Sequence, residues 1–353
     1  MLKRLCFALL LALFTMPAKG QDSIRREFSA GFGYGGILPH SEEVRYLARS
    51  HPWQLNAEYR MITEKGTGKK TPSYGAGIHF IDYQSEVLGS TLTLFGFAEP
   101  ALFGPVVFRL GCGIGWNSNP YNARSNPANI MLGSALSGMI QARLSACWQL
   151  HPKMRLNYGI GLTHFSNGAW SHPNKGINCF YIFSNAGFTG KKMKGPPAFA
   201  EGLHSKEMSW HTTLAASGSI TERFPYTGKK YFVWQVQGRI AKQLSQKSQF
   251  AAGLDLMHNE AKASFLRDNP EEGSSALLWG VTAGHSWFLL PFTSILSEFG
   301  YYIYRDNELY PAMYQRYGLR HHFGKKLAAG VLLKTHKGKA ECLEFNILIR
   351  SVR

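Results

Sequence analysis

The sequence predicts an all-β protein, a transmembrane antiparallel outer-membrane β-barrel of roughly 14 strands (12–16). Two features of the chain support this prediction. An export signal opens the chain and no later apolar run is long enough for a membrane helix. Stretches of alternating apolar and polar side chains then recur to the C-terminus. A soluble sandwich has the same period as a barrel strand, but the long repetition of such stretches favours the barrel.

The N-terminus has the composition of a secretory signal peptide over residues 1–20. Lys3 and Arg4 precede an apolar run, and the small residues Ala18 and Gly20 stand at positions −3 and −1 before the expected cleavage near Gly20. The apolar run is too short to cross a bilayer as a helix. We therefore expect an exported protein in the cell outer membrane of a Gram-negative organism, with the signal peptide removed.

The chain is strongly basic, with a formal net charge of +17. Removal of Lys3, Arg4 and Lys19 with the signal peptide leaves +14. A basic excess favours anionic partners, and export makes nucleic acid an improbable one. The phosphates of lipopolysaccharide are the anion we expect. The alternative, that these charges only solvate loops, stays open.

The first half of the chain reads as eight strands joined by long loops and short turns. Residues 106–116 alternate most clearly, with apolar side chains on one face and Arg or Gly on the other. Long polar loops at 36–52, 117–131 and 167–177 contrast with the short turn His151-Pro152. Barrels of the outer membrane have long external loops and short periplasmic turns. By strand count, the strand that ends at Ser166 runs outward.

The second half has the same pattern. Strands are predicted near 207–219, 229–243, 247–258, 274–288, 291–304, 313–323, 327–337 and 340–350. The basic segment 189–205, with Pro196-Pro197, is a possible internal boundary. Because the patterning is alike on both sides of it, we predict a single barrel over residues 21–353.

One strand end combines a base with a potential nucleophile. Residues two apart in a strand share a face, so His164 and Ser166 continue the apolar face that contains Leu162. Such a position suits catalysis on a lipid. The loop after it contains Asn167-Gly168 and Pro173-Asn174, which are also common turn residues.

The stretch 163–178, THFSNGAWSHPNKGIN, resembles the PagL family of lipid A 3-O-deacylases, which are outer-membrane esterases built on an eight-stranded barrel. The family pattern is His-x-Ser-Asn, then Pro-Asn-x-Gly-Ile, then an acid twelve positions after the serine. The resemblance implies an enlarged relative with Ser166 as nucleophile and His164 as general base. It also implies an oxyanion site made by Asn174 and the backbone near Asn167 and Gly168.

The chain departs from the family pattern at the catalytic acid, because Asn178 stands where the family has glutamate. Asparagine can orient a histidine through its side-chain oxygen but supplies no charge. Either Asn178 is the third member of the site, or an acid such as Glu42 or Glu43 substitutes, or the enzyme is weak or inactive.

The function expected from the resemblance is removal of an ester-linked acyl chain from lipid A, in the outer leaflet, by a serine esterase. We expect no cofactor and no metal, because no histidines and acids show metal-ligand spacing. The alternative is a non-catalytic outer-membrane barrel, either a porin or solute channel or a structural surface protein that acts through its long loops.

Overall fold

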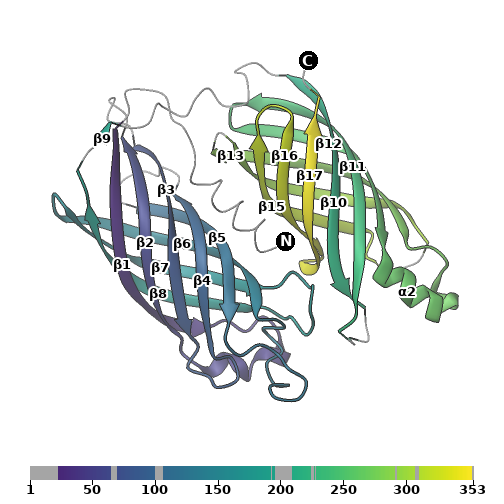
Figure 1. Ribbon diagram of the computed structural model, residues 1–353, viewed down its shortest axis with the longest axis horizontal. Coiled ribbons are helices and arrows are strands. Elements are labelled where there is room, and N and C mark those ends of the chain that lie inside the picture. The colour runs from purple at the N-terminus through teal and green to yellow at the C-terminus, as the bar shows by residue number, and fades with distance from the viewer. Residues whose placement is uncertain are drawn as a thin grey trace. The chain divides into compact units, whose positions relative to one another are not determined.

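The computed structural model describes residues 23–64, 70–99, 106–191, 193–194, 209–223, 226, 228–290, 292–306 and 310–351. The predicted signal peptide lies outside these residues. The described chain forms two compact units, each built on a closed β-barrel (Figure 1). The first unit holds the described residues up to Asn167 and those from Pro173 to Lys194. The second holds 168–172 and the described residues from 209 onward.

The first barrel consists of eight antiparallel strands, shown from purple to teal in Figure 1. They are β1 (Ser23–Ile37), β2 (Trp53–Glu64), β3 (Lys70–Asp82), β4 (Ser90–Glu99), β5 (Val106–Asn117), β6 (Leu136–His151), β7 (Met154–Ser166) and β8 (Ile177–Thr189). β1 pairs with both β2 and β8 and so closes the ring. A short strand, β9 (Met193–Lys194), pairs with the start of β1. Two 3-10 turns, η1 (Glu42–Val44) and η2 (Leu47–Arg49), lie in the loop between β1 and β2.

The second barrel also has eight antiparallel strands, and β17 pairs back to β10. Its elements are β10 (Trp210–Glu222), β11 (Lys230–Ser245), β12 (Ser248–Asn259), α2 (Glu260–Asp268), η3 (Pro270–Glu272), β13 (Leu277–Leu290), β14 (Thr293–Arg305), β15 (Met313–Phe323), β16 (Leu327–His336) and β17 (Lys339–Arg350). Among the described residues, no helix has the length and apolar character needed to span a bilayer.

The prediction of one barrel over residues 21–353 is wrong in closure, and the strand count of roughly 14 is too low, although sixteen lies within the predicted range of 12–16. Sixteen strands form two separate rings of eight. The β8 strand returns to β1, as in the pairing of Phe188 with Phe28, and this leaves no edge to which β10 could add. Alternation along a strand gives its two faces but not its neighbour, so the sequence pattern could not distinguish one large ring from two small ones.

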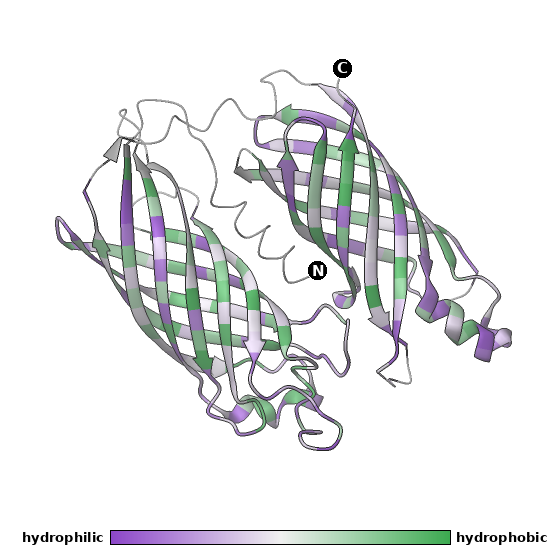
Figure 2. Ribbon diagram, viewed as in Figure 1, coloured by the Kyte–Doolittle hydropathy of each residue, from purple (hydrophilic) through white to green (hydrophobic). Residues whose placement is uncertain are grey.

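The alternation itself is as predicted, with apolar side chains outside and polar ones inside. On β2, Leu55 is exposed, whereas Asn56 and Glu58 are buried. The same change of hydropathy recurs along the strands of both units (Figure 2). Residues that face outward on other strands, such as Ile182 and Ile347, are about 60% and 59% exposed. Outward apolar faces are what a barrel presents to lipid.

Charged side chains fill the interior of the first barrel. One oxygen of Glu58 on β2 accepts hydrogen bonds from Arg109 and Arg143, each at 2.7 Å. Glu99 pairs with Arg109 and Arg60. These groups are buried and come from strands on different sides of the ring, so the network ties the strands together across the lumen.

The second barrel has a similar buried network. Arg316 on β15 donates to Asp255, Glu298 and Glu344, which come from three other strands. Arg239 pairs with Asp255 and Glu298 as well. Arg239 and Arg316 are therefore paired with acids of the same barrel, which offsets the cost of burying these charges.

An apolar cluster closes one end of the first barrel, beneath its long loops. It joins strand ends to loop residues: Ile37, Val44, Leu47, Ile81, Tyr83, Leu88, Phe95, Phe97, Met131, Leu132, Met139, Phe165, Ile177 and Cys179. Phe165 lies between His164 and Ser166 in sequence and is fully buried in this cluster. The cluster therefore fixes the end of β7 where the predicted site lies.

Candidate functional site

The end of β7 carries the predicted histidine and serine on its outward face. Tyr158 and Leu162 are exposed on this face, and His164 and Ser166 continue it as half-buried residues. Thr163 and Phe165 point inward and are fully buried. His164 and Ser166 thus share a face, as alternation predicts, at the end of the barrel with the long loops.

His164 is held by Asn178 on the neighbouring strand. The two residues are directly paired in the β7–β8 ladder, and His164 Nδ1 lies 2.7 Å from Asn178 Oδ1. An amide oxygen only accepts hydrogen bonds, so in this contact Nδ1 carries the proton. The other ring nitrogen, Nε2, is then without a proton and can act as a base.

Ser166 is held by Asn174 from the loop between β7 and β8. Asn174 Nδ2 donates to Ser166 Oγ at 2.9 Å, and its Oδ1 accepts from the backbone N–H of Asn167 at 3.2 Å. The side chain of Asn167 donates instead to Ser134 Oγ at 3.1 Å. Gly168 follows with φ +66°, a left-handed conformation that suits glycine. The Asn174 side chain is thus hydrogen-bonded directly to Ser166. The Asn167 side chain is instead hydrogen-bonded to Ser134, in the loop before β6.

Gly176 packs against the imidazole of His164. A Cβ added at Gly176 would lie 2.8 Å from His164 Cε1, and the residue has φ +77°. The neighbouring backbone is fixed, because the N–H groups of Lys175 and Gly176 donate to the carbonyls of Ile130 and Met131, both at 3.0 Å. Both the space and the backbone conformation at this position require glycine.

The two acids considered as substitutes for glutamate form other pairs. Glu42 pairs with Arg45 at 2.7 Å and both side chains are exposed. Glu43 pairs with Lys175. A different residue of the same loop reaches the site: His40 Nδ1 lies 3.3 Å from Asn178 Nδ2. Sequence reasoning missed His40, because it lies 138 positions from Asn178 and only closure of β1 onto β8 brings the two together.

An apolar surface adjoins this site on the outer wall. Exposed Ile140 on β6 lies directly across from His164, and exposed Ile160 and Leu162 precede it on β7. Gly138 lies across from Ser166, and a Cβ there would meet only the Ser166 carbonyl oxygen, at 3.5 Å. The wall beside Ser166 is therefore open and apolar, which suits an acyl chain.

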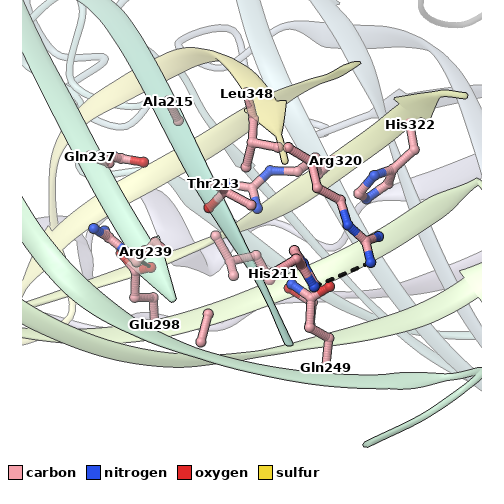
Figure 3. A pocket seen from close by; sticks show the side chains of 14 residues that line it. His211, Thr213, Ala215, Gln237, Arg239, Gln249, Glu298, Arg320, His322 and Leu348 are labelled. Carbon is pink, nitrogen blue, oxygen red and sulfur yellow. Dashed lines mark hydrogen bonds and ion pairs between the residues drawn. The ribbon is translucent and has the colours of Figure 1, made fainter. Parts of the chain in front are cut away.

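The second barrel contains a small internal cavity near one end of its lumen (Figure 3). Its lining is largely polar: His211, Thr213, Ala215, Gln237, Arg239, Gln249, Ala251, Ser286, Leu296, Glu298, Arg320, His322, Leu348 and Arg350. Arg239 is paired with Glu298, Arg320 with Asn346, and Arg350 with His211 at 3.2 Å. The arginines of the lining thus pair with side chains of the same barrel, and we interpret the cavity as part of the polar interior of the barrel.

Two family models match the chain. Residues 49–189 match the lipid A 3-O-deacylase (PagL) model, and residues 208–352 match the model of the acyloxyacyl hydrolase C-terminal domain (PagL_C). Together they span most of the chain. The chain belongs to the PagL family. The resemblance inferred from residues 163–178 is thereby confirmed, and each barrel of this PagL-family chain has a model of its own.

The solved structures that match the chain have low sequence identity and low TM-scores. A triple-mutant porin of Rhodopseudomonas blastica is 9% identical, with TM-score 0.21, and the match covers 93% of this chain and 100% of the porin. Omp33 of Acinetobacter baumannii is 7% identical, with TM-score 0.19 and coverage of 94% and 99%. No curated protein sequence matches the chain.

Family membership and the outward apolar faces together indicate a protein of the outer membrane. The same membership supports a hydrolase of the lipid A deacylase type, with lipid A as its substrate class.

Proposed function

We propose that this PagL-family protein hydrolyses an ester-linked acyl chain of lipid A, with Ser166 as nucleophile, His164 as general base and Asn178 as the third member. The observation that supports this most directly is the 2.7 Å contact between His164 Nδ1 and Asn178 Oδ1, two residues from Ser166 on the outward face. This contact leaves Nε2 of His164 as the proton acceptor that a serine nucleophile needs.

In the proposed reaction, Ser166 Oγ attacks the ester carbonyl as its proton passes to His164 Nε2. The tetrahedral intermediate then expels the sugar oxygen, which takes that proton and leaves as a hydroxyl group. Water attacks the resulting acyl-enzyme by the same route, with His164 again the base, and releases a free fatty acid. Every step uses side chains of the chain itself.

Asn174 is the proposed oxyanion donor. In the resting site its Nδ2 donates to Ser166 Oγ, and when that oxygen bonds to carbon the same N–H group lies close to the new oxyanion. The Asn167 N–H holds Asn174 Oδ1 and so keeps Nδ2 directed toward the serine. The backbone at Gly168, directly after Asn167, is proposed to supply the second donor.

Asn178, and not Glu42 or Glu43, is the third member that we propose. The carboxylates of these two acids are paired with Arg45 and Lys175. Asn178 meets the requirement of orientation but leaves the developing imidazolium without a counter-charge. The proposed enzyme therefore works with less electrostatic help than a carboxylate would give.

The test is release of fatty acid from lipopolysaccharide by purified protein in detergent. We expect Ser166→Ala to reduce release at least about 10³-fold, because a serine esterase without its nucleophile keeps only the contribution of its remaining groups. Ser184→Ala is the matched control, since Ser184 faces outward on β8 away from the site and should leave the rate unchanged. Undiminished release by Ser166→Ala would overturn the proposal.

A further inference from the structure

The Asn178 amide lies between two imidazoles, and only one of them is used by the proposed reaction. Its Oδ1 contacts His164 Nδ1 at 2.7 Å, and its Nδ2 contacts His40 Nδ1 at 3.3 Å. The contacts form a continuous line from the loop after β1, across the end of β8, to β7. We propose that His40 is a positioning residue that fixes the orientation of this amide. The inference rests on the proposed function.

The two ends of an asparagine side chain differ, because one is an acceptor and the other a donor. A carboxylate presents an oxygen to His164 whichever way it turns, but an amide presents either an acceptor or a donor. If the amide turned over, Nδ2 would donate to His164 Nδ1, and the proton of the neutral ring would move to Nε2. The nitrogen needed to deprotonate Ser166 would then be blocked. A site that uses asparagine in place of an acid therefore needs a second contact that selects one orientation.

His40 supplies that selection. Asn178 Nδ2 is a donor only, so the contact with His40 requires an unprotonated Nδ1 on the His40 ring. With Nδ2 held by His40, Oδ1 faces His164, and the His164 proton stays on Nδ1. His40 in this role touches neither substrate nor the reacting atoms.

The loop that carries His40 is fastened beside Asn178. The N–H of Leu38 donates to the Asn178 carbonyl at 2.8 Å, directly after the last β1–β8 pair. Farther along, Glu43 pairs with Lys175, and Val44 is fully buried in the apolar cluster. These contacts place His40 at Asn178 by backbone bonding and burial, although its own side chain is exposed.

The test is a double-mutant cycle between His40 and Asn178, measured as kcat for lipopolysaccharide deacylation. His40→Phe removes the acceptor and keeps a ring. We expect it to lower kcat about tenfold with KM little changed, since one neutral hydrogen bond selects the orientation. His40→Gln restores an acceptor and should recover part of the loss. His51→Phe, at an exposed histidine in the same loop, is the control and should leave kcat unchanged.

The decisive comparison uses Asn178→Asp, whose two oxygens make the orientation irrelevant. In that background His40→Phe should cost no more than about twofold. An equal loss in both backgrounds would mean that His40 only supports the loop, and it would overturn the inference. A wild-type rate for His40→Phe would do the same, while loss of activity in Ser166→Ala would still uphold the proposed function. Full activity of Ser166→Ala would instead overturn both.

Discussion

At the scale of single residues, the proposed site has an amide, Asn178, where the family pattern has a carboxylate. Asn178 orients His164 through one hydrogen bond of 2.7 Å and carries no charge. Loss of the charge and loss of the orientation are separate penalties. The orientation of His164 is retained, because Asn178 Oδ1 faces His164 Nδ1.

A carboxylate at this position should therefore increase turnover. We expect Asn178→Asp to raise kcat for lipid A deacylation about tenfold, because a hydrogen bond to a charged acceptor is stronger by roughly 1 kcal/mol or more than one to an amide. Steady-state rates on purified lipopolysaccharide test this. A fall in kcat for a correctly folded Asn178→Asp barrel would contradict the role given to Asn178.

Several residues of the site could be predicted from the sequence because they lie within one short stretch. Ser166, His164, Asn174 and Asn178 all fall within residues 164–178, and strand alternation gives the shared face of the first two. His40 could not be predicted in this way. Its place beside Asn178 depends on which strand closes the ring, and no local pattern carries that information.

At the scale of elements, the loop from Asn167 to Gly176 holds the proposed catalytic side chains in place. Asn174 holds the serine, and Gly176 leaves room for the imidazole while its backbone is tied to the loop before β6. The sequence indicated a loop of about this length, since Asn-Gly and Pro-Asn are turn signals. The sequence did not indicate that position 176 requires glycine. In the structure, the ring of His164 occupies the space that a side chain at position 176 would need.

Gly176→Ala tests this packing. The added methyl group would overlap His164 Cε1. The alanine would also have to adopt a φ of +77°, which is unfavourable for a residue with a side chain. We expect kcat to fall about 100-fold, the size of effect produced by a shift of about 1 Å in a catalytic group. Gly36→Ala is the control, since a Cβ there meets nothing within 4 Å. Equal activity of the two variants would contradict the account of Gly176.

At the scale of the whole molecule, two closed rings replace the single large barrel that the sequence predicted. The strands were predicted close to their observed positions, because alternation fixes them one at a time. The closure was not, because it depends on pairing between β1 and β8, and between β10 and β17. Small rings also explain the filled interiors: charged side chains from opposite walls reach one another, as Glu58 and Arg143 do. An interior crossed by such pairs gives no support to the porin alternative.

Removal of the Glu58 carboxylate should lower the free energy of unfolding of the first barrel. Glu58→Gln would leave Arg109 and Arg143 without their shared carboxylate oxygen, and loss of one partner of a buried ion pair costs about 3–5 kcal/mol. Glu42→Gln, which removes only an exposed pair with Arg45, should cost no more than about 1 kcal/mol. Urea unfolding in detergent compares the two. Equal stabilities would contradict the structural role of the network.

Ser166 is proposed to remove an acyl chain from lipid A in the outer membrane. The most direct measurement is the mass of lipid A from cells that express either the wild-type protein or Ser166→Ala at equal levels. We expect a lipid A species lighter by one ester-linked acyl chain in the wild-type cells and its absence in the Ser166→Ala cells. The same lighter species in both would contradict it.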